Sequence, residues 1–248
     1  MDRLIYSSLA AMRGAMSRQA TIANNLANVN TAGFRGEFTS ASAEWLKGSG
    51  GLNGRATVSQ DVTGANMTAG AVTATGRDLD VALNGNSMLT VQATDGSEAY
   101  TRRGDLQLSD SGLLTTGDGM PVLGQSGPIT LPPADSVSIG KDGQIWIVPQ
   151  GGDPKSPQAV DTLKLVSADG STIKKGIDGL FHETNGGTLP SDPDASLTSK
   201  SIEGSNVNAS ATLVDMIDAS RSWEAQVKML TTAQDMDKSS AALMQISE

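Results

Sequence analysis

The sequence predicts an α+β protein in which N- and C-terminal helices pair as a coiled coil, with an inserted antiparallel β-domain and an extended connector. Three observations lead to this prediction. Apolar residues recur at helical spacing at both ends of the chain. Asn-Gly and Asp-Gly dipeptides divide the middle into short segments. A run rich in Gly, Ser, Thr and Ala precedes that middle region. We therefore expect a helical domain from residues 1–36 and 203–248, a connector from 37–75, and a β-domain with its return loop from 76–202.

The first helix is expected over residues 4–28, a rod of roughly 37 Å at 1.5 Å per residue. Its apolar residues follow one another at steps of three and four, apart from an interruption at Gln19: Ile5, Leu9, Met12, Met16, Ala23 and Leu26. One such stripe is close to the heptad seam of a coiled coil. The pattern stops near Gly33, which can adopt the positive φ that ends a helix or opens a turn.

The second helix is expected to follow Ser205-Asn206-Val207-Asn208, where either asparagine can cap the first turn. Its apolar stripe is broken by polar residues and consists of Leu213, Met216, Ile217, Trp223, Val227, Leu230, Ala241 and Met244. Residues 1–36 carry four Arg and one Asp, a net charge of +3, whereas residues 203–248 carry three cations and seven carboxylates, a net charge of −4. Opposite charge favours two helices lying side by side. Two helices that only cap the middle domain are the alternative.

The connector contains few apolar anchors, and Gly48-Ser49-Gly50-Gly51 is its plainest flexible segment. A solvated linker is one interpretation. The other is that its sparse apolar residues lie against adjacent subunits of an assembly. A structureless loop of about 40 residues within a compact domain would be unusual, which favours the second interpretation.

The β-domain is predicted from hairpin dipeptides, whose residues tolerate positive φ. They are Asn84-Gly85, Asp95-Gly96, Asp118-Gly119, Asp142-Gly143, Asp169-Gly170 and Asp178-Gly179. Residues 145–148, Ile-Trp-Ile-Val, form a continuous apolar run that indicates a central strand. Residues 182–200 then return the chain to the terminal helices.

Composition argues against several classes of function. The net charge of −9 disfavours nucleic acid and anionic membranes as partners. The chain has no cysteine, and its one histidine, His182, has no second histidine with which to share a metal. Neither a nucleophile elbow nor a phosphate-binding loop occurs. We therefore expect no catalytic residues, no cofactor, no metal and no small-molecule substrate.

Several segments together resemble a known family. Residues 23–28, Ala-Asn-Asn-Leu-Ala-Asn, followed by Thr31-Ala32-Gly33-Phe34-Arg35, look like the N-terminal signature of the flagellar rod and hook axial proteins. Ser205-Asn206-Val207-Asn208 before a long helix resembles their C-terminal signature. Residues 78–83, 100–105 and 124–133 extend the similarity over nearly the whole chain. Residues 220–229 are closer to the proximal-rod members than to the distal-rod members, in which Gln-Arg-Ala-Tyr would be expected.

This resemblance implies a structural subunit of the proximal rod of the bacterial flagellar basal body, a shaft that spans the periplasm and transmits torque. The implied partners are copies of the chain, other proximal and distal rod proteins, and, during secretion, the flagellar type III export apparatus. Export would occur without a cleaved signal peptide. The alternatives are a distal-rod subunit and a soluble β-domain binding module with a helical oligomerisation stalk.

The expected assembly interface combines the helical stripes with the motif asparagines. It consists of Ile5, Leu9, Met12, Met16, Asn24, Asn25, Leu26, Asn28, Phe34, Asn206, Val207, Asn208, Ile217, Trp223, Val227 and Leu230. Each covered apolar side chain contributes on the order of 1.5–3 kcal/mol, and only when a neighbour buries it. We therefore expect the helices to be largely disordered in the free chain and to fold on assembly, with the three N-terminal asparagines fixing the register.

Overall fold

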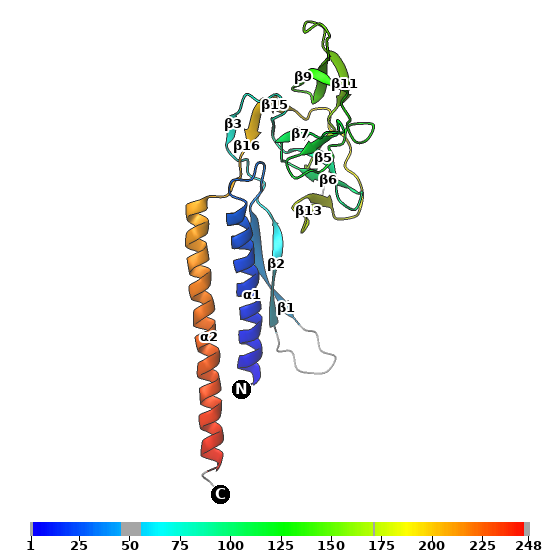
Figure 1. Ribbon diagram of the computed structural model, residues 1–248. Helices are drawn as coiled ribbons and strands as arrows, with labels where there is room; N and C mark the ends of the chain where they lie inside the picture. The colour runs from blue at the N-terminus through cyan, green and yellow to red at the C-terminus, as the bar shows by residue number, and fades with distance from the viewer. Residues whose placement is uncertain (1, 46–55, 171, 246–248) are drawn as a thin grey trace. The chain divides into compact units, whose positions relative to one another are not determined.

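The computed structural model is an α+β protein with a long helix at each end and short strands between them (Figure 1). It describes residues 2–45, 56–170 and 172–245. Helix α1 (Asp2–Ala27) and helix α2 (Ala209–Gln245) lie where the two apolar stripes predict them. No helix among the described residues combines the length and the apolar character needed to cross a membrane.

The chain divides into two compact units. Unit 1 contains the two helices and consists of Met1–Ala27, Glu37–Gly64 and Asn208–Glu248. Unit 2 contains most of the strands and consists of Asn28–Gly36 and Ala65–Val207. The division differs from the boundaries expected from the sequence in two respects. Most of the connector belongs with the helices, and the segment that follows α1 belongs with the strands.

In unit 1, α1 and α2 lie side by side, and strand β1 (Glu37–Trp45) runs along α1 (Figure 1). Strand β1 pairs with β2 (Ala56–Ala65), so much of the expected connector is strand rather than structureless chain. The Thr and Val residues of β2 favour extended backbone, and α1 supplies β1 with a packing partner. The glycine-rich segment 48–51 lies outside the described residues.

Among the described residues of unit 2, the paired strands are all antiparallel, as predicted. A five-stranded sheet has the order β12 (Leu165–Ser167), β5 (Ser87–Gln92), β6 (Glu98–Thr101), β14 (Phe181–Glu183) and β13 (Ile173–Lys175). A three-stranded sheet has the order β11 (Gln158–Thr162), β10 (Gln144–Pro149) and β9 (Ala134–Ile139). The two-stranded sheets are β15 (Leu197–Ser199) with β4 (Val81–Leu83), β16 (Ser201–Glu203) with β3 (Val72–Ala74), and β7 (Leu106–Leu108) with β8 (Leu114–Thr116).

The predicted turn dipeptides differ in what they connect. Gly96, Gly143 and Gly179 have positive φ and join the hairpins β5–β6, β9–β10 and β13–β14. Gly85 also has positive φ, but β4 pairs with β15 rather than with β5, so the hairpin interpretation of this dipeptide was wrong. The same holds for Gly170, because β12 pairs with β5 and not with β13. A turn dipeptide sets the local backbone and does not determine which strands pair. The apolar run 145–148 lies in β10, the central strand of its sheet, as predicted.

Two apolar clusters form the core of unit 2, and β5 separates them. Leu89 and Val91 belong to a large cluster that also contains Ile145, whereas Met88 belongs to a smaller one with Tyr100. Successive side chains of a strand point to opposite faces, so β5 is buried on both sides. Strand β5 therefore contributes side chains to both clusters of the core.

Candidate assembly interface

The side of α2 that is buried within the chain consists of small residues. Thr212, Ala219 and Ala233 are each less than 10% exposed, and they are spaced seven or fourteen residues apart. Gln226 occupies the remaining position of this heptad row and is half-buried. The main element that α2 contacts is α1. Small side chains at heptad spacing allow two helix backbones to approach closely.

The buried residues of α1 are also mostly small. Ser8, Gly14 and Thr21 are buried, and Ile22 is the large side chain buried on the part of α1 whose side chains the structure describes. Helix α1 contacts both α2 and β1, so these positions are covered from two sides. The apolar stripe predicted for α1 is therefore not the surface that α1 buries within one chain.

Large apolar side chains instead face solvent on both helices. They are 38% to 58% exposed, and they are Leu9 and Met16 on α1 and Leu213, Val214, Ile217, Val227, Met229 and Met236 on α2. On a helix with 3.6 residues per turn, the α2 members lie on both flanks of the buried row and on the face opposite to it. A helix that is apolar on several faces is typically buried on several faces. Within one chain, α2 carries apolar residues on several faces, but the large apolar side chains named above remain exposed.

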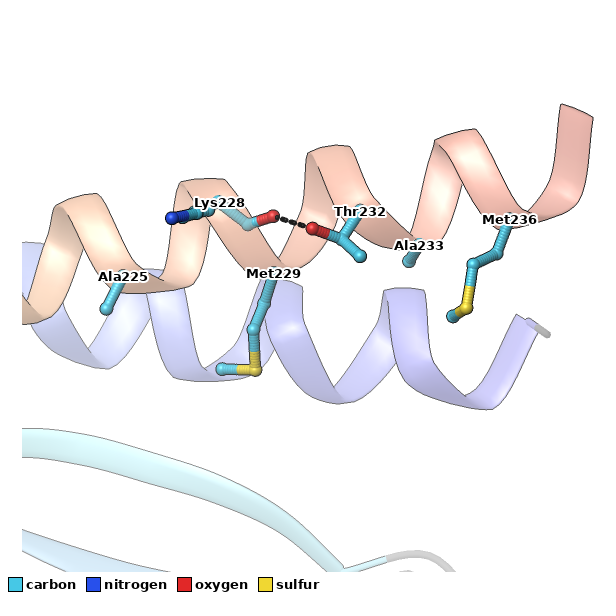
Figure 2. A pocket seen from close by; sticks show the side chains of 6 residues that line it. All are labelled: Ala225, Lys228, Met229, Thr232, Ala233 and Met236. Atoms are coloured by element: carbon cyan, nitrogen blue, oxygen red, sulfur yellow. Dashed lines mark hydrogen bonds between the residues drawn. The ribbon is translucent and has the colours of Figure 1, made fainter.

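One flank of α2 forms a shallow, mostly apolar groove of about 410 Å³ (Figure 2). Met229 and Met236 project from the same side of the helix in this view. The Thr232 hydroxyl donates a hydrogen bond to the Lys228 carbonyl at 2.9 Å, which leaves its methyl group for the groove. Ala225 and Ala233 complete the lining. Because methionine side chains are long and adaptable, they suit a surface that packs against another helix.

On α1, the predicted interface residues are not brought together by intrachain packing. Leu9 and Met16 are exposed, and Met12 and Leu26 are half-buried. The side chain of Ile5 lies outside the part of the structure that is described.

On α2, the predicted residues behave in the same way. Ile217 and Val227 are exposed, and Trp223 and Leu230 are half-buried. The predicted stripes therefore remain largely available for contacts outside the chain.

The three motif asparagines have partners inside the chain. The Asn25 side chain accepts a hydrogen bond from the Glu37 amide and donates one to the Glu37 carbonyl, both at 2.8 Å. Asn24 donates to the Glu37 carboxylate at 3.1 Å, and Asn28 accepts from the Thr31 hydroxyl at 3.1 Å. Asn25 thus joins the end of α1 to the start of β1.

The C-terminal signature divides its roles between its two asparagines. Asn208 caps α2, as predicted, because its side-chain oxygen accepts the Ala211 amide at 3.1 Å. Asn206 instead bonds to Gly36, Asn66 and Thr68 within unit 2. Val207, between them, is half-buried.

Phe34 belongs to unit 2 and is half-buried there. The Lys175 ammonium lies 3.8 Å from the centroid of its ring, a cation–π contact. The segment that carries Phe34 is thereby held to β13.

A buried charged cluster in unit 2 was not anticipated from the sequence. Arg35 and Arg102 share the carboxylate of Glu203, and all three side chains are at most 2% exposed. Burial, followed by the nearby positive charge of Arg102, lowers the pKa of Arg35. Arg35 and Arg102 lie in segments 31–35 and 100–105, which resemble the rod family, so the sequence offered a signal that these two residues matter. Glu203 carried no such signal, because its place depends on the pairing of β16 with β3.

The ionisable side chains at two sites of unit 2 are paired with one another. His182 Nε2 lies 2.9 Å from Asp178 Oδ2 at the β13–β14 turn, where both side chains are about one-third exposed. A polar hollow of about 600 Å³ is lined by Glu98 and Lys164, which form an ion pair at 2.7 Å. Tyr100 donates to the same carboxylate at 3.0 Å. Among the described residues, no group of three His, Cys, Asp or Glu side chains could hold a metal ion.

Three family models match the chain. Residues 5–35 match the flagella basal body rod protein family, residues 82–147 match the flagellar hook protein FlgE/F/G D1 domain, and residues 198–243 match the C-terminal family of flagellar basal body rod FlgEFG proteins. The matches include the two terminal signatures and the core of unit 2.

Whole-chain relatives agree with these models. The chain is 39% identical to flagellar basal-body rod protein FlgF of Escherichia coli strain K12 over 241 residues, 95% of each chain. It is 38% identical to FlgF of Salmonella typhimurium strain LT2 over 253 residues, 100% of each chain. It is 32% identical to the rod protein FlgG of Bacillus subtilis strain 168 over 259 residues, 95% of this chain and 97% of the relative. The family is structural and is not known for enzymes, in agreement with the expectation of no catalytic site. The chain therefore belongs to the flagellar basal-body rod protein family, as a structural rod subunit of the FlgF type.

Proposed function

We propose that this chain is a subunit of the proximal rod, and that α1 and α2 form a coiled coil that packs against the helices of neighbouring rod subunits. Those neighbours are copies of this chain and other proximal and distal rod proteins. The observation that carries the proposal is the division of the helix surfaces. Small residues are buried within the chain, whereas large apolar residues such as Ile217 and Met229 are exposed.

The free energy of this packing follows from the exposed apolar surface. Complete burial of a Leu, Ile, Val or Met side chain stabilises by about 1.5–3 kcal/mol. The eight exposed side chains named above are already partly covered, so each has on the order of 1 kcal/mol left to contribute. Contacts with several neighbours would bury most of them. The opposite net charges of the two terminal segments, +3 and −4, favour contact between α1 of one subunit and α2 of another.

The proposal extends to how the subunit reaches and serves the rod. We infer export through the flagellar type III apparatus without a cleaved signal, and a final position in the periplasm-spanning part of the basal body. Torque would pass through rigid packing of the helices. These statements rest on membership in the rod family and on the outward apolar faces of α1 and α2.

The proposal is tested by changing Ile217, which is 53% exposed and lies outside the buried row of α2. Ile217→Asp places a charge at an interface between subunits but at a solvent-facing position of the free chain. We expect cells that express this variant to export the protein and to form no rods, as seen by electron microscopy of basal bodies. In the purified variant, circular dichroism and thermal unfolding of unit 2 should be unchanged.

Ile217→Leu is the matched control, because it keeps the apolar area at the same position with a good helix former. It should assemble normally. Normal rods formed by Ile217→Asp would contradict the proposal, since a buried unpaired carboxylate would then have to be tolerated.

A further inference from the structure

The chain passes between units 1 and 2 at four points, next to residues 28, 36, 65 and 207. The segments of unit 2 that adjoin three of these points meet in one polar cluster. We name it the crossing junction and define it as the side chains of Arg35, Arg102, Glu203 and Asn206. All four residues belong to unit 2.

Glu203 is the centre of the crossing junction. One of its oxygens lies 2.8 Å from Arg35 Nη2 and accepts the Gly70 amide at 2.8 Å. The other accepts two hydrogen bonds from Arg102, at 2.9 and 2.7 Å. The carboxylate therefore joins three segments that are far apart in the sequence. Because the three charged side chains are buried, water screens the contacts between them only weakly.

Asn206 forms the second layer of the crossing junction. Its side-chain oxygen accepts the Gly36 amide at 2.8 Å, and its nitrogen donates to the carbonyls of Asn66 and Thr68 at 2.7 and 2.9 Å. Arg35 donates to the same Thr68 carbonyl at 2.7 Å. Segments 33–36, 66–70 and 203–206 are thus bonded to one another, and not only to the sheets of unit 2.

We infer that the crossing junction is a mechanical clamp, which keeps these three segments together when the terminal helices are loaded. Force applied through α1 enters unit 2 at residue 28, and force applied through α2 leaves at residue 207. Between those two points, Arg35 forms an ion pair with Glu203, and the Gly36 amide donates a hydrogen bond to Asn206. Several polar contacts must therefore break before the segments at these crossing points can separate. This inference rests on the proposed function, in which the helices carry torque.

Stability alone does not explain a buried cluster of two arginines and one carboxylate. Replacing buried ion pairs by apolar residues of similar volume is often neutral or stabilising. Hydrogen bonds and ion pairs between charged and amide groups fix the relative positions of the bonded segments, because each such bond has a defined length and direction. Such bonds therefore hold the segments at the crossing points in one arrangement more precisely than an apolar contact would.

The test is single-molecule force spectroscopy of the full chain, held by tags at its first and last residues. In Asn206→Ala, the event that releases segment 28–36 from unit 2 should occur on the order of tenfold sooner at a given force, because three hydrogen bonds are lost. Arg35→Lys is a second variant that keeps the buried charge but loses the guanidinium fork, and it should shift in the same direction.

Asn84→Ala is the matched control. Its side chain also joins distant segments of unit 2, by bonds to Ser196 and Thr198, but away from the crossing points. Its release time should stay within about twofold of the wild type. Equal shifts in Asn84→Ala and Asn206→Ala, or no shift in either junction variant, would overturn the inference. This result is independent of rod assembly, so the Ile217→Asp test can fail while the clamp stands, and the reverse.

Discussion

Gly33, the glycine of the N-terminal motif, should not tolerate a side chain, and Gly33→Ala tests this. Gly33 has a φ of +64°, and its amide donates to the Glu203 carbonyl at 2.7 Å. A Cβ atom at this position would lie 2.2 Å from the carbonyl oxygen of Arg102 and 2.6 Å from the Arg103 nitrogen. These are backbone atoms, so no side-chain rotation relieves the contact. The segment would have to move away from residues 102 and 103, which directly follow β6.

The expected cost combines three contributions. Left-handed backbone costs an L-residue about 1–2 kcal/mol. Overpacking against fixed atoms costs about 1–3 kcal/mol. Loss of the Gly33 hydrogen bond, as the segment moves, costs about 1 kcal/mol. We therefore expect Gly33→Ala to lower the free energy of unfolding of unit 2 by roughly 3–6 kcal/mol, which is on the order of 10 °C in melting temperature for a unit of this size.

The assay is urea and thermal unfolding of the purified full chain, followed by a probe in unit 2. Gly96→Ala is the matched control, because Gly96 also has a positive φ, +85°, but a Cβ there would meet nothing within 4 Å. It should cost only about 1 kcal/mol, the backbone contribution. If Gly33→Ala costs no more than Gly96→Ala, the close approach to the backbone of Arg102 and Arg103 does not constrain the motif and the reasoning is wrong.

Two further predictions concern Tyr100 and Gln226. Burial, with Glu98 also contributing, raises the pKa of Tyr100 to about 12, so this group stabilises the fold below about pH 10 and loses that contribution as pH rises towards 12. Urea midpoints between pH 9 and 12 should therefore fall less steeply in Tyr100→Phe than in the wild type, and equal slopes would contradict the assignment. Gln226 carries a buried side-chain oxygen that has no hydrogen-bond partner in the described structure. Gln226→Leu should slow hydrogen exchange in α1 and α2, which in the free wild-type chain should exchange faster than residues 78–181. Unchanged exchange in the helices would show that the oxygen is satisfied.

The existence of both helices could be predicted from the sequence, but the surface they share could not. Apolar periodicity finds a helix because side chains three and four residues apart lie on one face. It identifies the most apolar face, which in this chain looks outward at Leu9, Met16 and Ile217. The face buried within the chain consists of residues such as Ala219 and Thr21, whose small side chains hardly affect a hydropathy pattern. In a protein that assembles, the most apolar face of a helix can be the face that contacts other subunits rather than the face buried within the chain.

The strands of unit 2 were predicted locally and mispaired where pairing is long-range. Asp95-Gly96 gave the correct hairpin because its two strands are neighbours in the sheet. Asn84-Gly85 did not, because β4 pairs with a strand more than a hundred residues later. For the same reason, the crossing junction could not be predicted from the sequence. Arg35, Arg102 and Glu203 come from three separate segments, and no short-range pattern relates them.

The motifs of the rod family acquire a physical meaning when the two units are considered separately. In the N-terminal motif, Asn24 and Asn25 act in unit 1 and join α1 to β1, whereas Gly33 and Arg35 act in unit 2. In the C-terminal motif, Asn208 caps α2, whereas Asn206 bonds segments of unit 2. Each signature thus serves both units, at the places where the chain passes between them. These residues build the subunit. The outward apolar residues that would join subunits lie elsewhere on the helices, so changes in the motifs should impair folding of the subunit before they impair contacts between subunits.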